Sequence, residues 1–409
     1  LSASCQLCAD IQRLGIHHNQ ALHNSVIRRL DRLLAARDAL PFVGDRIPQP
    51  ETFTDGVPIA FIDTPSGEPT LVRIPLDRLT THAFFCGVPG SGKTHAVRIL
   101  LTQLPPHVRV IIFDPNRSYE VLCSDPTRWL SIDWEDTRLN PLLPPPGYVE
   151  RKWLNEAAEI LTRGELLHSR WLYVDELDRA FESAHARARA PGGAFVCPSL
   201  FDVYDALARR RFRYGSREQG YLEALRNVLH GRLRSTGDVY NCSSGMEPAL
   251  INTRVRISTE GLMPLPVTRF FIDCIIHYAC RARSLAPLPD PPRLHTLIVI
   301  EEAQTLLAKL PGITFYEELL LRARALGVGF VLLAQDIANI DPIILAAVSN
   351  IFLFAQSSSE GKRVAQSMLD LSKGEAELLG RLSTGRCYIR YIGHKTFPYA
   401  FTARTPSHV

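Results

Sequence analysis

The sequence lacks any apolar run that approaches the roughly 20 residues needed for a membrane-spanning helix. It also lacks the basic, apolar and small-residue regions that mark a secretory signal peptide. Its nine cysteines are odd in number and follow no disulfide framework, which is typical of a reducing compartment. These absences predict a cytoplasmic protein without a membrane partner.

A large charge excess is also missing. The formal net charge is +4, which by itself does not indicate nucleic-acid binding. The densest arginine run, residues 209–213, is more typical of a solvated face than of a binding site. With 409 residues, 46% apolar and 22% charged, the composition is that of an ordinary globular chain with two or three domains.

One cysteine pair stands apart from the others. Cys5 and Cys8 are separated by two residues, and His17, His18 and His23 follow them. Cysteine and histidine are the usual ligands of zinc, so this group could form a zinc site. Because the spacing is loose, the alternative that these residues bind no metal stays open.

A complete phosphate-binding loop, GVPGSGKT, occupies residues 87–94. A loop that wraps a phosphate points several backbone N–H groups inward, and glycines permit the required dihedral angles and close approach. Lys93 would supply positive charge to the β and γ phosphates, and Thr94 would offer a hydroxyl to Mg²⁺. We therefore expect a nucleoside triphosphate, bound by Gly87, Pro89, Gly90, Ser91, Gly92, Lys93, Thr94 and His95.

The flanks of this loop argue against a chance match. Residues 82–86 are a short apolar run that predicts a buried strand. Apolar residues then recur at helical spacing from Ala96 to Leu104, where Pro105 stops the helix. Residues 108–113 predict a second strand, ending at Asp114. Strand, loop, helix and strand together make a right-handed βαβ unit.

A second set of candidate residues follows an apolar strand at residues 295–300, which ends in two carboxylates. In a parallel sheet, such a strand end places its acidic groups beside the bound ligand. One carboxylate is needed to hold the water shell of Mg²⁺, and another to polarise the attacking water. We assign Glu301 to the metal, through water, and Glu302 to the catalytic water. The alternative is a strand end that is acidic by coincidence.

The next predicted strand, residues 328–335, ends in Gln335, whose amide could reach the γ-phosphate. A helix predicted over residues 319–327 precedes it and carries Arg322 and Arg324 near its end. An arginine can complete a neighbouring subunit's site and neutralise charge in the transition state. It can equally cap a helix by a favourable interaction with the helix dipole.

The composition divides the chain into four regions. Residues 1–40 predict a helical segment, and residues 41–80, punctuated by prolines, predict a small β appendage with a hairpin. Residues 81–149 and 250–405 alternate strands with helices and predict the core, whereas residues 150–249 predict a mainly helical insertion. The expected fold class is α/β with a central, mainly parallel sheet.

Together these segments resemble the HerA-type branch of the HerA/FtsK superfamily of ring-forming ATPases, from about Leu71 to Thr405. The matching segments are IPLDRLTTHAFFCGVPGSGKT (74–94), IIFDPNRSYEVL (111–122), NPL (140–142), IVIEEAQ (298–304), VLLAQDIANID (331–341), NIFLF (350–354) and LSTGR (382–386). The last two look like the final two strands of the family's sheet.

The resemblance implies a RecA-like P-loop core that hydrolyses ATP, and a hexameric ring that moves DNA through its pore. It favours Arg324, eleven residues before Gln335, over Arg322 as the arginine finger. It also implies a nuclease or other effector as partner. Two features depart from the family. Gln304 stands where many relatives carry histidine, and the residues before the P-loop are too few for the full N-terminal β-barrel of HerA-type proteins.

Two classes of function fit these residues. An ATP-driven DNA translocase or helicase would contact the DNA backbone without regard to sequence, with Arg117, Lys362 and Arg363 as candidate contacts. Alternatively, the ATPase scaffolds or activates an effector such as a nuclease, or powers a conjugation or secretion machine without itself moving DNA. A small-molecule kinase is a third alternative, but the sequence has no evident acceptor-site motif.

Overall fold

The computed structural model describes residues 50–53, 55–63, 69–162, 170–187, 196–211, 215–307, 315–393 and 399–406. The predicted helical segment 1–40 lies outside this part of the chain, and so do Cys5 and Cys8. The turn of the predicted hairpin lies outside it as well.

The described strands form one sheet of eleven strands in the order β2-β1-β11-β10-β9-β3-β8-β7-β4-β6-β5. The seven strands from β9 to β5 are parallel, whereas β2, β1, β11 and β10 pair antiparallel. The strands are β1 (Val57–Ile62), β2 (Thr70–Ile74), β3 (Ala83–Cys86), β4 (Arg109–Asp114), β5 (Leu130–Asp133), β6 (Arg254–Ser258), β7 (Thr296–Ile300), β8 (Val328–Ala334), β9 (Asn350–Leu353), β10 (Arg386–Tyr391) and β11 (Phe401–Arg404).

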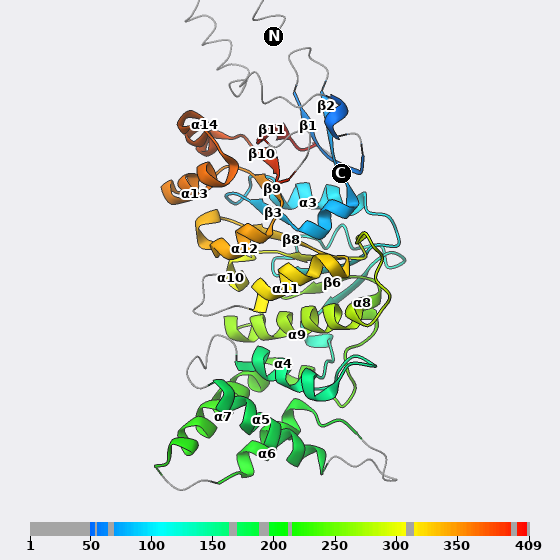
Figure 1. Cartoon of the computed structure of the whole chain (residues 1–409), viewed down its shortest axis with the longest axis vertical. Helices are drawn as coiled ribbons and strands as arrows, with labels where there is room; N and C mark the ends of the chain where they lie inside the picture. Colours follow the sequence, from blue (N-terminus) through cyan, green and yellow to red (C-terminus); the bar gives the residue numbers. More distant parts are fainter. Residues whose placement is uncertain are drawn as a thin grey trace, which may run out of the picture.

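Helices flank this sheet and form one end of the elongated molecule (Figure 1). The α-helices are α3 (Lys93–Thr102), α4 (Glu150–Thr162), α5 (Arg170–His185), α6 (Leu200–Arg209), α7 (Arg217–Thr236), α8 (Ala249–Asn252), α9 (Leu265–Ser284), α10 (Gln304–Leu307), α11 (Phe315–Ala323), α12 (Pro342–Ala347), α13 (Ser359–Leu369) and α14 (Lys373–Leu378). The 3₁₀ turns are η3 (Pro50–Phe53), η4 (Leu76–Thr81), η5 (Trp134–Asp136), η6 (Gly237–Tyr240), η7 (Arg324–Leu326), η8 (Ile337–Asn339) and η9 (Leu379–Arg381). Of the helices described, none has the length and apolarity to span a bilayer.

The parallel strands are apolar on both sides because helices cover both faces of the sheet. Successive strand residues point to opposite faces, so Phe84 and Phe85 of β3 belong to two different cores. Phe85 packs in the core that contains α3, whereas Phe84 packs in the larger core that contains α9 and the helices α4 to α7. Burial on both faces fixes the strand register, which in turn fixes where the loops emerge.

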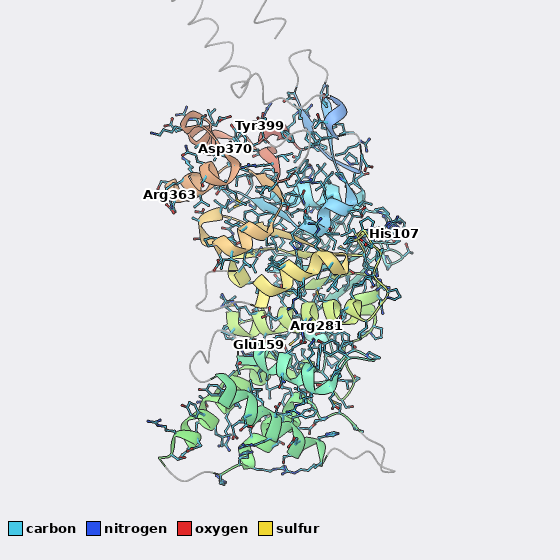
Figure 2. All side chains as sticks on the ribbon, viewed as in Figure 1. His107, Glu159, Arg281, Arg363, Asp370 and Tyr399 are labelled. Carbon is cyan, nitrogen blue, oxygen red and sulfur yellow. The ribbon has the colours of Figure 1, made fainter. Side chains whose placement is uncertain are left out.

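Helices α4 to α7 lie together at one end of the molecule, and α9 lies between them and the sheet (Figure 1). Glu156 of α4 accepts hydrogen bonds from His277, at 2.8 Å, and from Arg281, at 2.9 Å, both on α9. Arg281 of α9 and Glu159 of α4 are labelled at this junction in Figure 2. The helical region is thereby attached to the sheet through a partly buried charged contact.

The predicted fold class is confirmed: the sheet is large, mostly parallel and flanked by helices. The helix predicted over 319–327 ends as α11 at Ala323 and continues as the turn η7 to Gly327, whose φ of 68° closes it. The hairpin strands β1 and β2 pair as expected, and β1 also joins the core sheet through β11. The domain boundaries remain a prediction.

One strand prediction is wrong. Residues 382–386 look like a strand in the sequence, but β10 begins only at Arg386, and β11 follows it as a further strand. Gly385 has a φ of +80°, which turns the chain out of an extended path. Residues 382–385 therefore form a loop, and this loop lies against the P-loop.

Candidate active site

The P-loop lies between β3 and α3, at the edge of the sheet where the parallel strands end. Gly90 and Gly92 have φ values of 76° and 104°, which side-chain-bearing residues rarely adopt. The Gly87 N–H donates to Ala334 O at 3.1 Å and the Val88 N–H donates to Ala355 O at 2.9 Å. The loop is thus anchored to the ends of the two strands that flank β3, while its tip stays exposed.

Lys93 begins α3 and folds back over the loop. Its Nζ donates to Gly87 O at 2.6 Å and to Val88 O at 3.0 Å. Burial lowers the pKa of Lys93, and the charges of Glu301 and Glu302 oppose that shift. The ammonium therefore lies between the loop that would hold phosphates and the acidic end of β7.

Two distant stretches of the chain meet at Thr94. Its Oγ1 donates a 2.9 Å hydrogen bond to Glu301 Oε1, directly after β7. Burial raises the pKa of Glu301, and the hydrogen bond from Thr94 partly offsets that rise. A hydroxyl and a carboxylate side by side are the hard oxygen donors that Mg²⁺ prefers, so these two residues fit the expected metal.

Glu302 points its carboxylate toward the loop that follows β4. Its backbone φ of 51° is uncommon for a residue with a side chain, and such conformations cluster at functional sites. Its Oε1 accepts a 2.9 Å hydrogen bond from Asn116 Nδ2. The two carboxylates of β7 therefore differ in partners: Glu301 faces the P-loop, and Glu302 faces the Asn116 turn.

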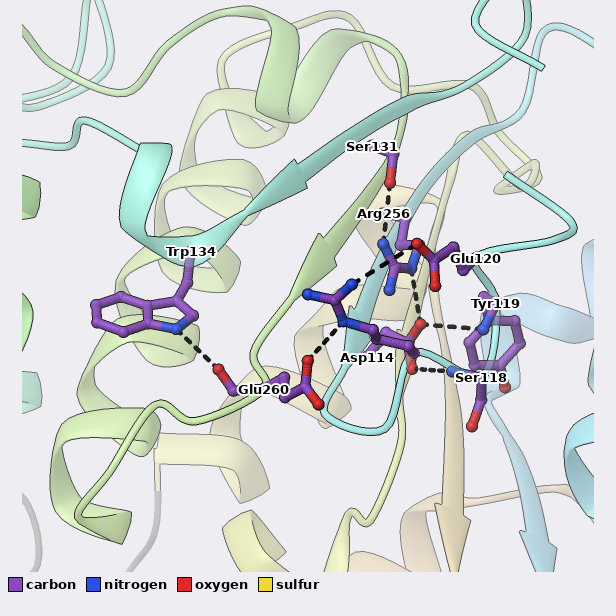
Figure 3. A network of polar contacts seen from close by, with 9 residues as sticks. Asp114, Ser118, Tyr119, Glu120, Ser131, Trp134, Arg256 and Glu260 are labelled. Atoms are coloured by element: carbon purple, nitrogen blue, oxygen red, sulfur yellow. Dashed lines mark hydrogen bonds and ion pairs between the residues drawn. The ribbon is translucent and has the colours of Figure 1, made fainter. Parts of the chain in front are cut away.

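A buried ion pair supports this corner of the sheet (Figure 3). Arg256 Nε of β6 donates to Asp114 Oδ2 of β4 at 2.7 Å, with both side chains almost fully buried. Asp114 also accepts the backbone N–H groups of Ser118 at 2.8 Å and Tyr119 at 3.0 Å. One carboxylate thus fixes the turn that presents Asn116 to Glu302.

Tyr119 is completely buried behind Glu301. Burial raises its pKa far above the usual tyrosine value, and the charge of Glu301 adds to that rise. Its hydroxyl interacts with the Glu301 carboxylate, and this interaction lowers the pKa of Glu301 against the larger rise that burial causes. Tyr119 therefore stays a neutral phenol beside Glu301.

Gln335 and Arg324 lie at opposite ends of β8. Gln335 follows Ala334 directly and is exposed next to the P-loop, because Ala334 O accepts the Gly87 N–H. Arg324 precedes the strand, in η7, and its side chain is exposed. The seven residues of β8 separate them by about 23 Å. Arg324 therefore lies far from the P-loop of its own chain.

No protein-family model matches the chain. It is similar to the DNA double-strand break repair helicase HerA of Sulfurisphaera tokodaii, with 23% identity over 337 residues that cover 79% of this chain. The matched region spans 65% of that relative's length.

Solved structures show the same fold. VirB4 of Thermoanaerobacter pseudethanolicus superposes with a TM-score of 0.64 at 17% identity, covering 87% of this chain and 97% of that one. The bacterial conjugative coupling protein TrwB, in an unbound form, superposes with a TM-score of 0.62 at 14% identity, covering 84% and 88%. The chain is therefore similar in sequence to a HerA protein and shares the fold of VirB4 and TrwB.

ATP and Mg²⁺ fit this site. The plasmid coupling protein TrwB, whose fold is similar, is known in complex with ADP and Mg²⁺; it superposes with a TM-score of 0.59 at 16% identity, covering 82% of this chain and 87% of that one. Zinc has no such support: the part of the chain described here holds no group of three or more His, Cys, Asp and Glu residues placed to bind a metal. Cys5 and Cys8 lie outside that part.

The sequence prediction missed a loop that contacts the P-loop. The Gly385 N–H donates to Ser91 O at 2.9 Å, and Thr384 Oγ1 donates to Gly90 O at 3.3 Å. A Cβ at position 92 would lie 3.1 Å from Gly385, which is a tight contact, and the φ of 104° at Gly92 also disfavours a side chain. The Ser-Thr-Gly run at residues 383–385 could have indicated a loop before β10, but not its contact with the P-loop.

His95 is placed differently from the other P-loop residues. Its Nε2 lies 2.7 Å from Pro406 O, so the imidazole is directed toward the end of the described chain. Any nucleotide contact from this residue would therefore come from its backbone N–H, in the first turn of α3. Asn116, by contrast, was matched only as part of a motif, and its contact with Glu302 was not foreseen.

Proposed function

We propose that the protein is an ATP-driven DNA translocase or helicase that works as a hexameric ring. The hydrogen bond from Thr94 to Glu301 carries the proposal, because it joins the phosphate-binding loop to the acidic strand end. The similarity to a relative named a DNA double-strand break repair helicase supports DNA as the substrate. Because the chain spans 65% of that relative, its activity on DNA has to be tested directly.

Each residue of the site has a proposed role in hydrolysis. Lys93 would bind the β and γ phosphates, which its position over the loop allows. Thr94 and, through water, Glu301 would hold Mg²⁺, which neutralises phosphate charge. Glu302 would orient the attacking water and accept its proton, and Gln335 would contact the γ-phosphate.

Arg324 would act in a neighbouring subunit. Its position at the far end of β8 rules out a contact with the P-loop of its own chain. A head-to-tail interface, which generates a ring, would bring the arginine edge of one subunit toward the P-loop edge of the next. Hydrolysis would then depend on assembly, since the transition-state charge is neutralised only at the interface.

DNA binding is the part of this proposal that needs its own experiment. ATP hydrolysis should rise when double- or single-stranded DNA is added, irrespective of sequence, and the stimulation should weaken as salt increases. Among the candidate contacts, Arg363 is already paired with Glu360 at 2.5 Å and projects from α13 (Figure 2). Rings threaded by DNA in electron micrographs would support the proposal, and monomers under every condition would contradict it.

A second function is favoured by the folds of VirB4 and TrwB, the latter described as a conjugative coupling protein. The ATPase would then power a conjugation or secretion machine, or activate an effector such as a nuclease, without itself moving DNA. Its hydrolysis would respond to the partner protein and be indifferent to DNA. We place both versions in the cytoplasm, which fractionation of the producing cells can test.

A further inference from the structure

Within the part of the chain that the structure describes, Asn116 is the only residue whose side chain is hydrogen-bonded to the carboxylate of Glu302. Its Nδ2 donates to Glu302 Oε1 at 2.9 Å, from the turn that follows β4. A carboxylate that orients water needs its oxygens directed toward that water. An amide bound to one of those oxygens therefore competes with the proposed catalytic role of Glu302.

The turn that carries Asn116 is held rigidly on one side. The Asp114 carboxylate accepts the N–H groups of Ser118 and Tyr119, and the buried guanidinium of Arg256 holds that carboxylate in place. Because the turn is anchored at its base, Asn116 is presented to Glu302 in a defined position. The hydrogen bond between them does not depend on a loosely held loop.

The other side of the same turn is exposed and charged. Arg117, the next residue, has a φ of 55° and donates to Glu260 Oε2 at 2.5 Å. Its side chain is 47% exposed and that of Glu260 is 55% exposed. Exposed ion pairs contribute little and are screened by salt, so a phosphate can replace Glu260 as the partner of Arg117.

Glu260 comes from the loop after β6 and is anchored separately. Its backbone O accepts a 3.0 Å hydrogen bond from Trp134 Nε1. Arg117 also lies 3.8 Å from the carboxylate of Glu120, on its own turn. Release of Arg117 from Glu260 therefore leaves Glu260 in place and removes the contact that ties the Asn116–Arg117 turn to the loop after β6. Because the two residues are consecutive, a backbone change at Arg117 alters the position of Asn116.

We propose that Asn116 is a positioning residue that restrains Glu302, and that a DNA phosphate bound by Arg117 relieves this restraint. The inference rests on the proposed function, since it names the residues through which DNA contact would raise ATP hydrolysis. Before DNA binds, the Asn116 amide keeps Glu302 from orienting water. When a phosphate takes Arg117 from Glu260, the turn shifts and Glu302 is freed.

The test compares purified full-length wild type with Asn116→Ala, Asn116→Gln and a matched control, Asn241→Ala. Asn241 is also an exposed asparagine whose amide donates to a carboxylate, Asp238 at 3.3 Å, but it lies at the end of the helical region. ATP hydrolysis is measured without DNA and with saturating double-stranded DNA. Circular dichroism and thermal melting establish that each variant is folded.

We expect Asn116→Ala to hydrolyse ATP without DNA about threefold to tenfold faster than wild type, which is the effect of losing one ordinary hydrogen bond at an accessible position. Its ratio of DNA-stimulated to basal hydrolysis should fall toward one. Asn116→Gln, which retains the amide, should lie between wild type and Asn116→Ala. Asn241→Ala should behave as wild type.

The outcomes separate this inference from the proposed function. If Asn116→Ala hydrolyses ATP without DNA no faster than wild type does, Asn116 does not restrain Glu302. This conclusion holds whether or not DNA stimulates hydrolysis. A wild type that DNA fails to stimulate contradicts the proposed DNA function, yet a faster basal rate in Asn116→Ala would still support the restraint on Glu302. A parallel loss of basal and stimulated rates would show a purely structural role for Asn116.

Discussion

Thr94 and Glu301 lie 207 residues apart in the chain, yet the hydroxyl of one donates a 2.9 Å hydrogen bond to the carboxylate of the other. Parallel pairing produces this contact, because β3, β8, β7 and β4 are neighbours whose carboxyl ends share one edge. The loops that follow these strands therefore converge, although helices and other strands separate them in the sequence.

Replacing Lys93 should weaken nucleotide binding. Lys93→Ala removes the charge that faces the phosphates, and we expect ATP affinity to fall by about tenfold to hundredfold, the usual range for a hydrogen bond to a charged group. A fluorescent ATP analogue titrated into the purified protein measures this. Lys152→Ala, an exposed lysine on α4, is the control, and equal affinity in both variants would refute the assignment.

Arg324→Ala should abolish hydrolysis in the assembled protein while leaving nucleotide binding intact. Since Arg324 cannot reach the P-loop of its own chain, mixing this variant with Glu302→Gln subunits should restore part of the activity. At some interfaces an intact Arg324 would then face an intact Glu302. Arg322→Ala is the control. A mixture as inactive as its components would leave Arg324 as a structural residue.

The Asp114–Arg256 pair predicts a large stability effect. Asp114→Ala leaves a buried guanidinium without its counter-charge, and such changes cost about 3–5 kcal/mol in the free energy of unfolding. The double variant Asp114→Ala with Arg256→Met should recover part of this loss, because no unpaired charge remains. Urea unfolding measures all three proteins. If Asp114→Ala unfolds at the urea concentration of the parent, the pair contributes nothing.

His82 predicts a dependence of stability on pH. Its Nδ1 accepts the Phe330 N–H at 3.2 Å, its Nε2 lies 2.9 Å from Leu320 O, and burial lowers its pKa to about 4. As pH falls, His82 of the unfolded chain is therefore protonated near pH 6.5, whereas His82 of the folded protein is protonated only near pH 4. The contribution of His82 to the free energy of unfolding is fully present above pH 6.5. It is lost as pH falls toward 4, by up to about 1.4 kcal/mol per pH unit.

Unfolding by urea between pH 7 and 4.5 measures this loss. The stability of His82→Gln should decline less steeply with pH than that of wild type, even if the variant is less stable at pH 7. His107→Gln, an exposed histidine just before β4, should keep the wild-type slope. Equal slopes in all three proteins would contradict a buried, neutral His82.

The sequence was sufficient to predict the strands that build the site, because burial on both faces gives them continuous apolar runs. It was also sufficient to place Glu301 and Gln335 at strand ends. The contact of Gly385 with the P-loop could not be predicted, since it depends on β10 and β11 folding back beside β9. The contact of Asn116 with Glu302 likewise depends on which strand lies next to β7.

Glu302→Gln tests the central claim most directly, because the claim assigns the two carboxylates after β7 to one bound Mg²⁺-ATP. Equilibrium ATP binding and steady-state hydrolysis should be measured on the same preparation. We predict that the variant binds ATP as wild type does and hydrolyses it at least about a hundredfold more slowly, as expected for loss of a general base. Hydrolysis at the wild-type rate would show that Glu302 does not activate water and would contradict the account.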